Sequence, residues 1–84
     1  MKTNTNTAGA PFRAYTPAAL GTAIRHYRRQ AGLSQAELAE LTGLNRTYLS
    51  ALEQGRETEQ LRRLFRVFGQ LGVRISLERL ERSD

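Results

Sequence analysis

The sequence of 84 residues contains no cysteine and one histidine, His26. The absence of cysteine excludes a disulfide scaffold and a thiolate metal site, and it fits a reducing cytoplasm. A single histidine lacks the companions that a metal site or a catalytic centre requires. We therefore expect neither a metal nor any other cofactor, and we interpret His26 as an ordinary structural residue.

Apolar runs long enough to cross a membrane are also missing. The N-terminal stretch MKTNTNTAG is polar and lacks the apolar middle of a signal peptide. The sequence shows neither a nucleophile–base–acid set nor a glycine-rich phosphate loop. These absences predict a soluble, cytoplasmic protein that is not an enzyme. A single domain of this size has a marginal core, so we expect help from a partner subunit.

Acidic residues are absent from residues 1–33, which carry five basic residues, whereas residues 34–84 carry eight of each sign. The net charge of +5 therefore lies in the N-terminal part of the chain. All basic residues but one are arginine, whose planar guanidinium suits phosphate. A solvated helix face explains this charge as well as nucleic-acid binding does, so charge alone leaves both interpretations open.

Residues 1–15 are polar and lack periodicity, which predicts a flexible N-terminal arm. Thr16 and Pro17 then read as an N-cap followed by proline at the first helical position. Apolar residues at helical spacing continue this helix until Gly32. Arg25, Arg28 and Arg29 lie on the side of the helix opposite the apolar face.

Two short helices follow, with a tight turn between them. Ser34 and Glu37 form a capping box at the start of the first. Gly43 suits the left-handed conformation that closes a helix. Asn45 caps the next helix, which ends at Gly55.

Thr58 is the expected cap of a fourth helix over residues 59–71. Its apolar arc is wider than one core face needs, which favours a subunit interface over a purely internal role. Gly69, inside this helix, predicts a close approach of another helix. After Gly72 the apolar residues alternate, which predicts one strand over residues 73–80.

A single strand cannot satisfy its own backbone groups. Because no second strand is evident, we expect the strand to pair across a homodimer. The predicted dimer contacts are Phe65, Phe68, Val73, Ile75 and Leu77. The predicted fold is all-α, with four to five helices over residues 16–72 and this one short C-terminal strand.

Two short helices joined by a glycine-containing turn are typical of the helix-turn-helix. In that motif the first helix crosses the phosphate backbone, and the second enters the major groove with its N-terminal residues at the base edges. An ordinary helical hairpin gives the same spacing. The arginine excess and the small size of the domain favour the DNA-binding interpretation.

The stretch GLSQAELAELTGLNRTYLSALEQGRET resembles the helix-turn-helix of phage repressor and Cro-like proteins. The similar features are Ser-Gln at the start of the first short helix, Leu-Ala in its middle, glycine in the turn and Leu-Glu-x-Gly after the second. The longer stretch LRRLFRVFGQLGVRISLER is similar to HipB-type antitoxins, whose C-terminal strands pair between subunits. This resemblance implies a lambda-repressor-like fold, an operator-binding homodimer and a HipA-like kinase toxin as partner.

The resemblance also implies roles for individual residues. The base-reading positions are Asn45, Arg46, Thr47 and Ser50. The phosphate-binding positions are Ser34, Gln35, Tyr48 and Arg56. Arg46 is suited to guanine, because a guanidinium can bond two acceptors at the guanine edge.

Some positions depart from the family pattern. Ala51 stands where relatives carry a long polar base reader, and Glu57 and Glu59 place acid near the DNA side. The acids are also explained by helix capping, because carboxylates favour the positive end of the helix dipole. For Glu53 we favour an ion pair with an arginine of the first helix over a contact with DNA.

Two other functions stay open from the sequence. One is a stand-alone regulator, either a phage-type repressor or a restriction-modification controller. The other is a protein-interaction module that mainly inhibits a partner.

Overall fold

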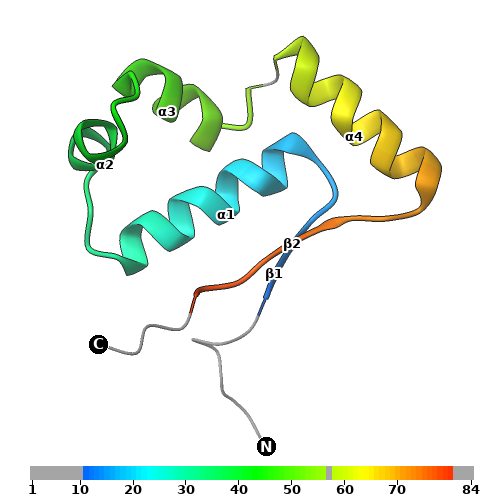
Figure 1. Cartoon of the computed structure of the whole chain (residues 1–84), viewed down its shortest axis with the longest axis horizontal. Coiled ribbons are helices and arrows are strands. Elements are labelled where there is room, and N and C mark those ends of the chain that lie inside the picture. The colour runs from blue at the N-terminus through cyan, green and yellow to red at the C-terminus, as the bar shows by residue number, and fades with distance from the viewer. Residues whose placement is uncertain (1–10, 57, 81–84) are drawn as a thin grey trace, which may run out of the picture.

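The computed structural model describes residues 11–56 and 58–80. Its elements in chain order are β1 (Phe12–Ala14), α1 (Pro17–Gln30), α2 (Gln35–Thr42), α3 (Arg46–Glu53), α4 (Glu59–Leu71) and β2 (Ile75–Leu77). Helix α1 is central and contacts α3, α4 and β1 (Figure 1). The prediction of a small, mainly helical domain is confirmed. None of the described helices is both long and apolar enough to cross a membrane.

Local side-chain chemistry sets the start of every helix. The side-chain oxygens of Thr16, Ser34, Asn45 and Thr58 each accept a hydrogen bond from a backbone N–H of the first turn. These bonds satisfy amide donors that have no partner inside the helix. All four caps were predicted from the sequence and are confirmed.

The core lies where α1 meets α3, α4 and the sheet. Its buried apolar residues are few, and most of them are small: Ala14, Ala23, Ala39, Leu49 and Phe65. Helices α1 and α3 approach closely at Gly21, where an added Cβ would lie 2.2 Å from the carbonyl oxygen of Leu52. The prediction of a close approach at Gly69 is wrong, because a Cβ there would meet no atom within 4 Å.

Strands β1 and β2 form a two-stranded antiparallel sheet, with Phe12 opposite Leu77 and Ala14 opposite Ile75. The hydroxyl of Tyr27 on α1 donates to the carbonyl oxygen of Leu77 over 2.8 Å and ties the sheet to the helix. The C-terminal strand was predicted, but its expected lack of a partner within the chain was wrong. Its partner is a segment of the predicted flexible arm. Residues 1–10 of that arm lie outside the described residues.

The predicted dimer contacts occupy different environments. Phe65 is buried in its own chain, where its ring meets that of Phe68 edge-on at 5.9 Å, so its assignment to a dimer surface needs correction. Ile75 and Leu77 are half-buried on the same side of the sheet as buried Ala14. Val73 is exposed.

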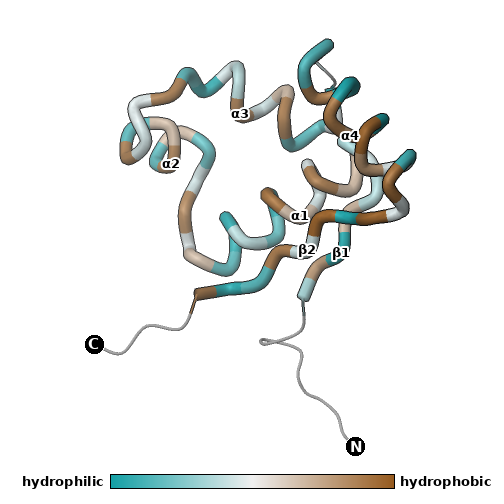
Figure 2. Tube along the Cα trace, turned by 45° about the vertical axis from the view of Figure 1, so that its right-hand side comes forward, coloured by the Kyte–Doolittle hydropathy of each residue, from teal (hydrophilic) through white to brown (hydrophobic). Residues whose placement is uncertain are grey.

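The outer flank of α4 is apolar and exposed. Leu64, Val67 and Leu71 are between 44% and 67% exposed, and hydrophobic segments are visible along this helix in Figure 2. The wide apolar arc predicted for this helix therefore divides into a buried part, centred on Phe65, and this open flank. We call Leu64, Val67 and Leu71 the α4 flank.

Candidate nucleic-acid interface

Helices α2 and α3 are joined by a turn that changes the chain direction. Gly43 has φ 71° and its N–H bonds the carbonyl oxygen of Ala39, which closes α2. The left-handed conformation carries no Cβ penalty at glycine. The side chain of Asn45 then accepts from the N–H of Thr47 over 2.7 Å and starts α3. Both helices lie on the side of α1 away from the sheet (Figure 1).

Helix α3 has one buried and one open side. Leu49 and Glu53 are buried and hold the helix against the body of the domain. Arg46 and Thr47 are exposed at its N-terminal end, and Ser50 is half-buried one turn later. The helix therefore presents its first turns outward, which is the orientation that reading of a major groove requires.

A buried ion pair fixes the angle between α1 and α3. The Arg28 guanidinium donates to both carboxylate oxygens of Glu53, with Nε–Oε2 at 2.5 Å and Nη2–Oε1 at 2.9 Å. A third donor of Arg28 reaches the carbonyl oxygen of Leu33 at 2.8 Å. The interpretation of Glu53 as the partner of an arginine in the first helix is confirmed.

Gln35, at the start of α2, joins the same network. Its Nε2 donates to Oε1 of Glu53 over 3.1 Å. The hydrogen bond from Arg28 holds the pKa of Glu53 below its usual value, against the opposing effect of burial, and the bond from Gln35 acts in the same direction. The ionised carboxylate of Glu53, on α3, thus orients one side chain of α1, Arg28, and one of α2, Gln35.

Two polar hollows adjoin on the open side of α3. One, of about 300 Å³, is lined by Gln35, Arg46, Thr47, Ser50, Ala51, Gln54 and Arg56. The other, of about 330 Å³, is lined by Arg25, Arg28, Gln35, Ser50, Glu53 and Gln54. Because Gln35, Ser50 and Gln54 belong to both, the two hollows form one continuous polar surface from α1 to the end of α3. We call it the α3 surface.

The sequence interpretation missed two members of the α3 surface. Gln54 donates from Nε2 to the hydroxyl oxygen of Ser50 over 3.1 Å. Its position eight residues after Arg46 and four after Ser50 places all three near one helix face, a spacing that is readable in the sequence. Arg25 was noted only as part of the basic excess, because nothing in the sequence shows that α1 passes beside Ser50.

Two predicted DNA-contacting side chains also serve as helix caps. The hydroxyl of Ser34 accepts from the N–H of Glu37 over 3.0 Å, and Glu37 accepts from the N–H of Ser34 over 2.7 Å. These bonds hold the pKa of Glu37 below its usual value. Ser34 keeps its hydroxyl proton, and Asn45 keeps its side-chain amide nitrogen, as the groups that can donate to another molecule.

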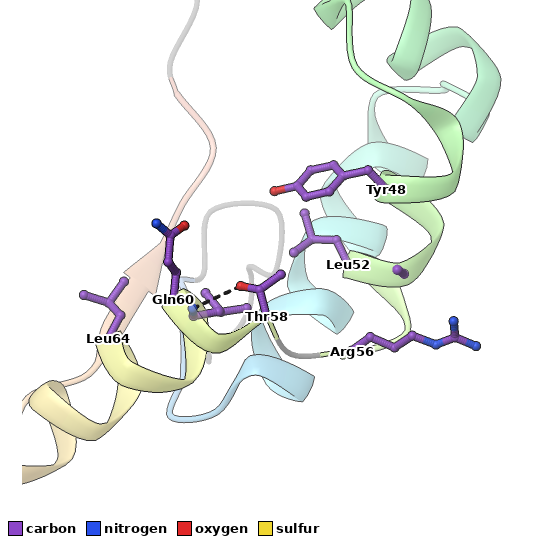
Figure 3. Close-up of a pocket in the computed structure, with 8 residues that line it drawn as sticks. Tyr48, Leu52, Arg56, Thr58, Gln60 and Leu64 are labelled. Carbon is purple, nitrogen blue, oxygen red and sulfur yellow. Dashed lines mark hydrogen bonds between the residues drawn. The ribbon is translucent and has the colours of Figure 1, made fainter.

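Tyr48 lies over a different, largely apolar hollow of about 490 Å³ between α3 and α4. In Figure 3, Tyr48 and Leu52 of α3 face Gln60 and Leu64 of α4, whereas Arg56 extends away. Arg56 lines this hollow and the α3 surface, so it lies at the boundary between them. Leu64 links the hollow to the α4 flank.

Comparison with known proteins agrees with this geometry. The family model described as a helix-turn-helix domain matches residues 19–77. An uncharacterized HTH-type transcriptional regulator of Sinorhizobium fredii, y4mF, is 34% identical over 65 residues, which are 77% of this chain and 86% of that protein. An uncharacterized HTH-type transcriptional regulator of Methanothermobacter thermautotrophicus is 43% identical over 51 residues, which are 61% of this chain and 74% of that protein.

A phage protein is also similar. The immunity repressor protein of Bacillus phage phi105 is 37% identical over 57 residues, which are 68% of this chain but only 40% of that repressor. No solved structure matches the chain.

Proposed function

We propose that the chain, which belongs to the family of helix-turn-helix domains, binds double-stranded operator DNA and represses transcription. The observation that carries this proposal is the placement of α3. Leu49 and the buried Arg28–Glu53 pair anchor one side of this helix, while Arg46 and Thr47 are exposed at its N-terminal end. An anchored helix with polar residues at its leading end suits insertion into a major groove.

The base-reading residues in this proposal are Asn45, Arg46, Thr47 and Ser50. Arg46 pairs with guanine through two hydrogen bonds, and Thr47 offers a hydroxyl or a methyl group to the neighbouring base. Asn45 donates through its amide nitrogen, because its oxygen caps α3. Ser50 is held by Gln54 and contributes at the next step along the groove.

The phosphate-binding residues are Ser34, Gln35, Tyr48 and Arg56, to which the structure leads us to add Arg25 and Gln54. Gln35 is the best-oriented of them, because Glu53 fixes its side chain through one amide N–H. The second N–H is then available to a phosphate oxygen at the start of α2. Such contacts position the protein on DNA but carry no sequence information.

The test compares Arg46→Ala with Gln35→Ala on a library of randomised operators. Loss of Arg46 should cost about 1–3 kcal/mol of binding free energy and relax the preference at one base pair per half-site. Loss of Gln35 should weaken binding to all sequences alike. Equal weakening on every sequence by Arg46→Ala would reduce this residue to a phosphate contact.

We further propose that the protein acts as a homodimer through the α4 flank. Three large apolar side chains lie open along one helix, whereas the described residues contain no large side chain that is completely buried. Covering this flank with a second copy would extend a small core. A two-fold dimer reads two half-sites, whose centres should lie roughly 34 Å apart or a multiple of that distance.

Sedimentation of two neighbouring charge variants tests the dimer. Leu71→Lys places a charge on the α4 flank, and Gln70→Lys places the same charge on the adjacent exposed position. The first should shift the protein to monomer and the second should not. Identical sedimentation of both variants and the parent as dimers would exclude the α4 flank as the interface.

A finer proposal concerns the biological role. The similarity of residues 61–79 to HipB-type antitoxins supports a cytoplasmic antitoxin of a HipBA-like type II module. Such a protein represses its own operon and holds a HipA-like kinase toxin in an inactive complex. Co-expression with the product of the adjacent gene tests this: a stable complex with loss of kinase activity is expected, and an adjacent gene without a kinase would contradict the proposal.

The phage relative favours a second candidate. A stand-alone phage-type repressor needs the same α3 surface but no toxin partner. The name of the Bacillus phage phi105 relative, an immunity repressor protein, supports this alternative. The two candidates predict the same operator binding by the isolated protein. The protein encoded by the adjacent gene therefore distinguishes them, because only the antitoxin requires a kinase toxin.

A further inference from the structure

The sheet has a second face that takes no part in the α3 surface. Side chains alternate between the faces of a strand. Phe12, Ala14, Ile75 and Leu77 are buried or half-buried on one face, whereas Arg13 and Ser76, which are paired across the strands, are exposed on the other. Tyr15 and Arg74, one residue beyond the paired segment, are exposed as well. By the same alternation Glu78, one residue beyond β2 and exposed, lies on the side of Arg74 and Ser76. We call Arg13, Tyr15, Arg74, Ser76 and Glu78 the outer sheet face.

Within this face Arg74 is held by an aromatic ring. Its guanidinium carbon lies 5.6 Å from the centre of the Tyr15 ring, which is within the range of a cation–π interaction. Tyr15 is nevertheless 65% exposed. A stacked guanidinium loses less freedom when it binds than an unrestrained side chain does.

The chemistry of the outer sheet face suits carboxylates. It offers two guanidinium groups and two hydroxyl groups that can donate hydrogen bonds, against one carboxylate, Glu78, so its net charge is positive. The two described segments that contain it, residues 11–16 and 73–80, hold three arginines and one acid, Glu78. A carboxylate fits the donor fork of arginine in a bidentate geometry.

The position and composition of the face favour protein over DNA. The sheet and α3 lie on opposite sides of α1 in both views (Figures 1 and 2), so a duplex bound at α3 lies on the far side of the domain. Arginine and tyrosine are also among the residues that are enriched at the energetic centres of protein–protein interfaces. A three-residue strand spans only about 10 Å, which matches a short peptide segment.

We propose that the outer sheet face docks an acidic, extended segment of a second protein. Carboxylates of that segment pair with Arg13 and Arg74, and an apolar side chain packs on the ring of Tyr15. Because this face lies away from the α3 surface, the segment and operator DNA bind at the same time. The inference goes beyond the proposed function, since it concerns a surface that DNA recognition leaves unused.

The experiment uses a labelled, end-capped peptide of alternating glutamate and valine as the probe. Binding to the full chain is followed by fluorescence anisotropy, with the glutamine–valine peptide as the neutral control. The variant Arg13→Ser/Arg74→Ser should bind the acidic peptide at least tenfold more weakly. The matched control is Arg63→Ser/Arg66→Ser, which removes the same charge from exposed positions of α4 and should leave binding unchanged.

Two further measurements keep the outcome unambiguous. Tyr15→Ser, which removes the ring beside Arg74, should weaken peptide binding by a smaller factor, and operator binding by all these variants should match the parent.

Three results would overturn the proposal: no binding of the acidic peptide, equal weakening by both double variants, or weakening of duplex binding by Arg13→Ser/Arg74→Ser in place of peptide binding. The last result would identify the face as a nucleic-acid contact. Operator binding by the parent is measured separately, so failure of the proposed repressor function is distinguished from failure at this face.

Discussion

Arg28 of α1 and Glu53 of α3 form a two-point ion pair in which the side chains are only 9% and 3% exposed. The pair joins the first helix of the domain to the end of the proposed recognition helix. Gln35 of α2 bonds the same carboxylate. The orientation of α3 relative to the rest of the domain therefore depends on one buried negative charge.

Removal of that charge should lower the free energy of unfolding. Glu53→Gln leaves the buried guanidinium of Arg28 without its counter-charge, and we expect a loss of about 3–5 kcal/mol in the free energy of unfolding. Urea denaturation measures this loss. The double variant Arg28→Met/Glu53→Leu removes both charges and should recover most of the stability. If the double variant is as unstable as Glu53→Gln, the buried charge is not the cause.

The same pair predicts loss of stability in acid. The pKa of Glu53 is lower in the folded protein than in the unfolded chain, where its usual value is about 4.5. Its contribution is therefore complete above that value and disappears as the pH falls through the lower, folded pKa. Glu37 acts with the same sign through its bonds to Ser34.

Thermal unfolding, measured at a series of pH values from neutral to acidic, checks this dependence. The free energy of unfolding should begin to fall below about pH 5. Arg28→Met/Glu53→Leu lacks the Glu53 carboxylate and should show a shallower fall. A parallel fall in the two proteins would contradict the assignment to Glu53.

Two glycines in helices should respond in opposite ways to alanine. At Gly21 the new Cβ would lie 2.2 Å from a carbonyl oxygen of α3, so the helices must separate, and we expect a loss of about 1–3 kcal/mol. At Gly69 the new Cβ meets open space, so the higher helix propensity of alanine should add about 0.5–1 kcal/mol. Melting curves of the two variants provide the comparison. A stabilised Gly21→Ala would show that α1 and α3 are less closely packed than described.

The pairing of the strands within one chain is tested through their attachment to α1. Tyr27→Phe removes the hydrogen bond to the carbonyl oxygen of Leu77 and should cost about 0.5–1.5 kcal/mol. Ile75→Pro removes a backbone donor from β2 and should cost more. Because β2 pairs with β1 of its own chain, both losses should be independent of protein concentration. A loss that grows on dilution would instead place the strand pairing between subunits.

The helices were predictable from the sequence because their limits depend on neighbouring residues. A side-chain oxygen at each N-cap and glycine at the turns act over three or four positions, and these signals were read correctly at Thr16, Ser34, Asn45 and Thr58. The buried partner of Glu53 was also predicted in kind, as an arginine of the first helix.

Features that depend on distant segments were not predictable in the same way. Phe12–Ala14 is too short to show an alternating pattern within a polar segment, and only its pairing with β2 makes it a strand. The apolar arc of α4 shows a wide face but does not show that Phe65 points inward while Leu71 is open. The place of Arg25 beside Ser50 likewise arises from the crossing of α1 and α3.

The register of the sheet has a consequence for the order in which the chain folds. Phe12 and Leu77 are opposite each other, although they stand at the two ends of the described sequence. Closing a loop of this length costs roughly 4 kcal/mol of chain entropy, whereas each helix and the α2–α3 turn form from residues close together. The pairing becomes favourable only when α1 already provides a surface for the strands. We therefore expect the sheet to be the last part to assemble, with β1 unpaired during synthesis until β2 has left the ribosome.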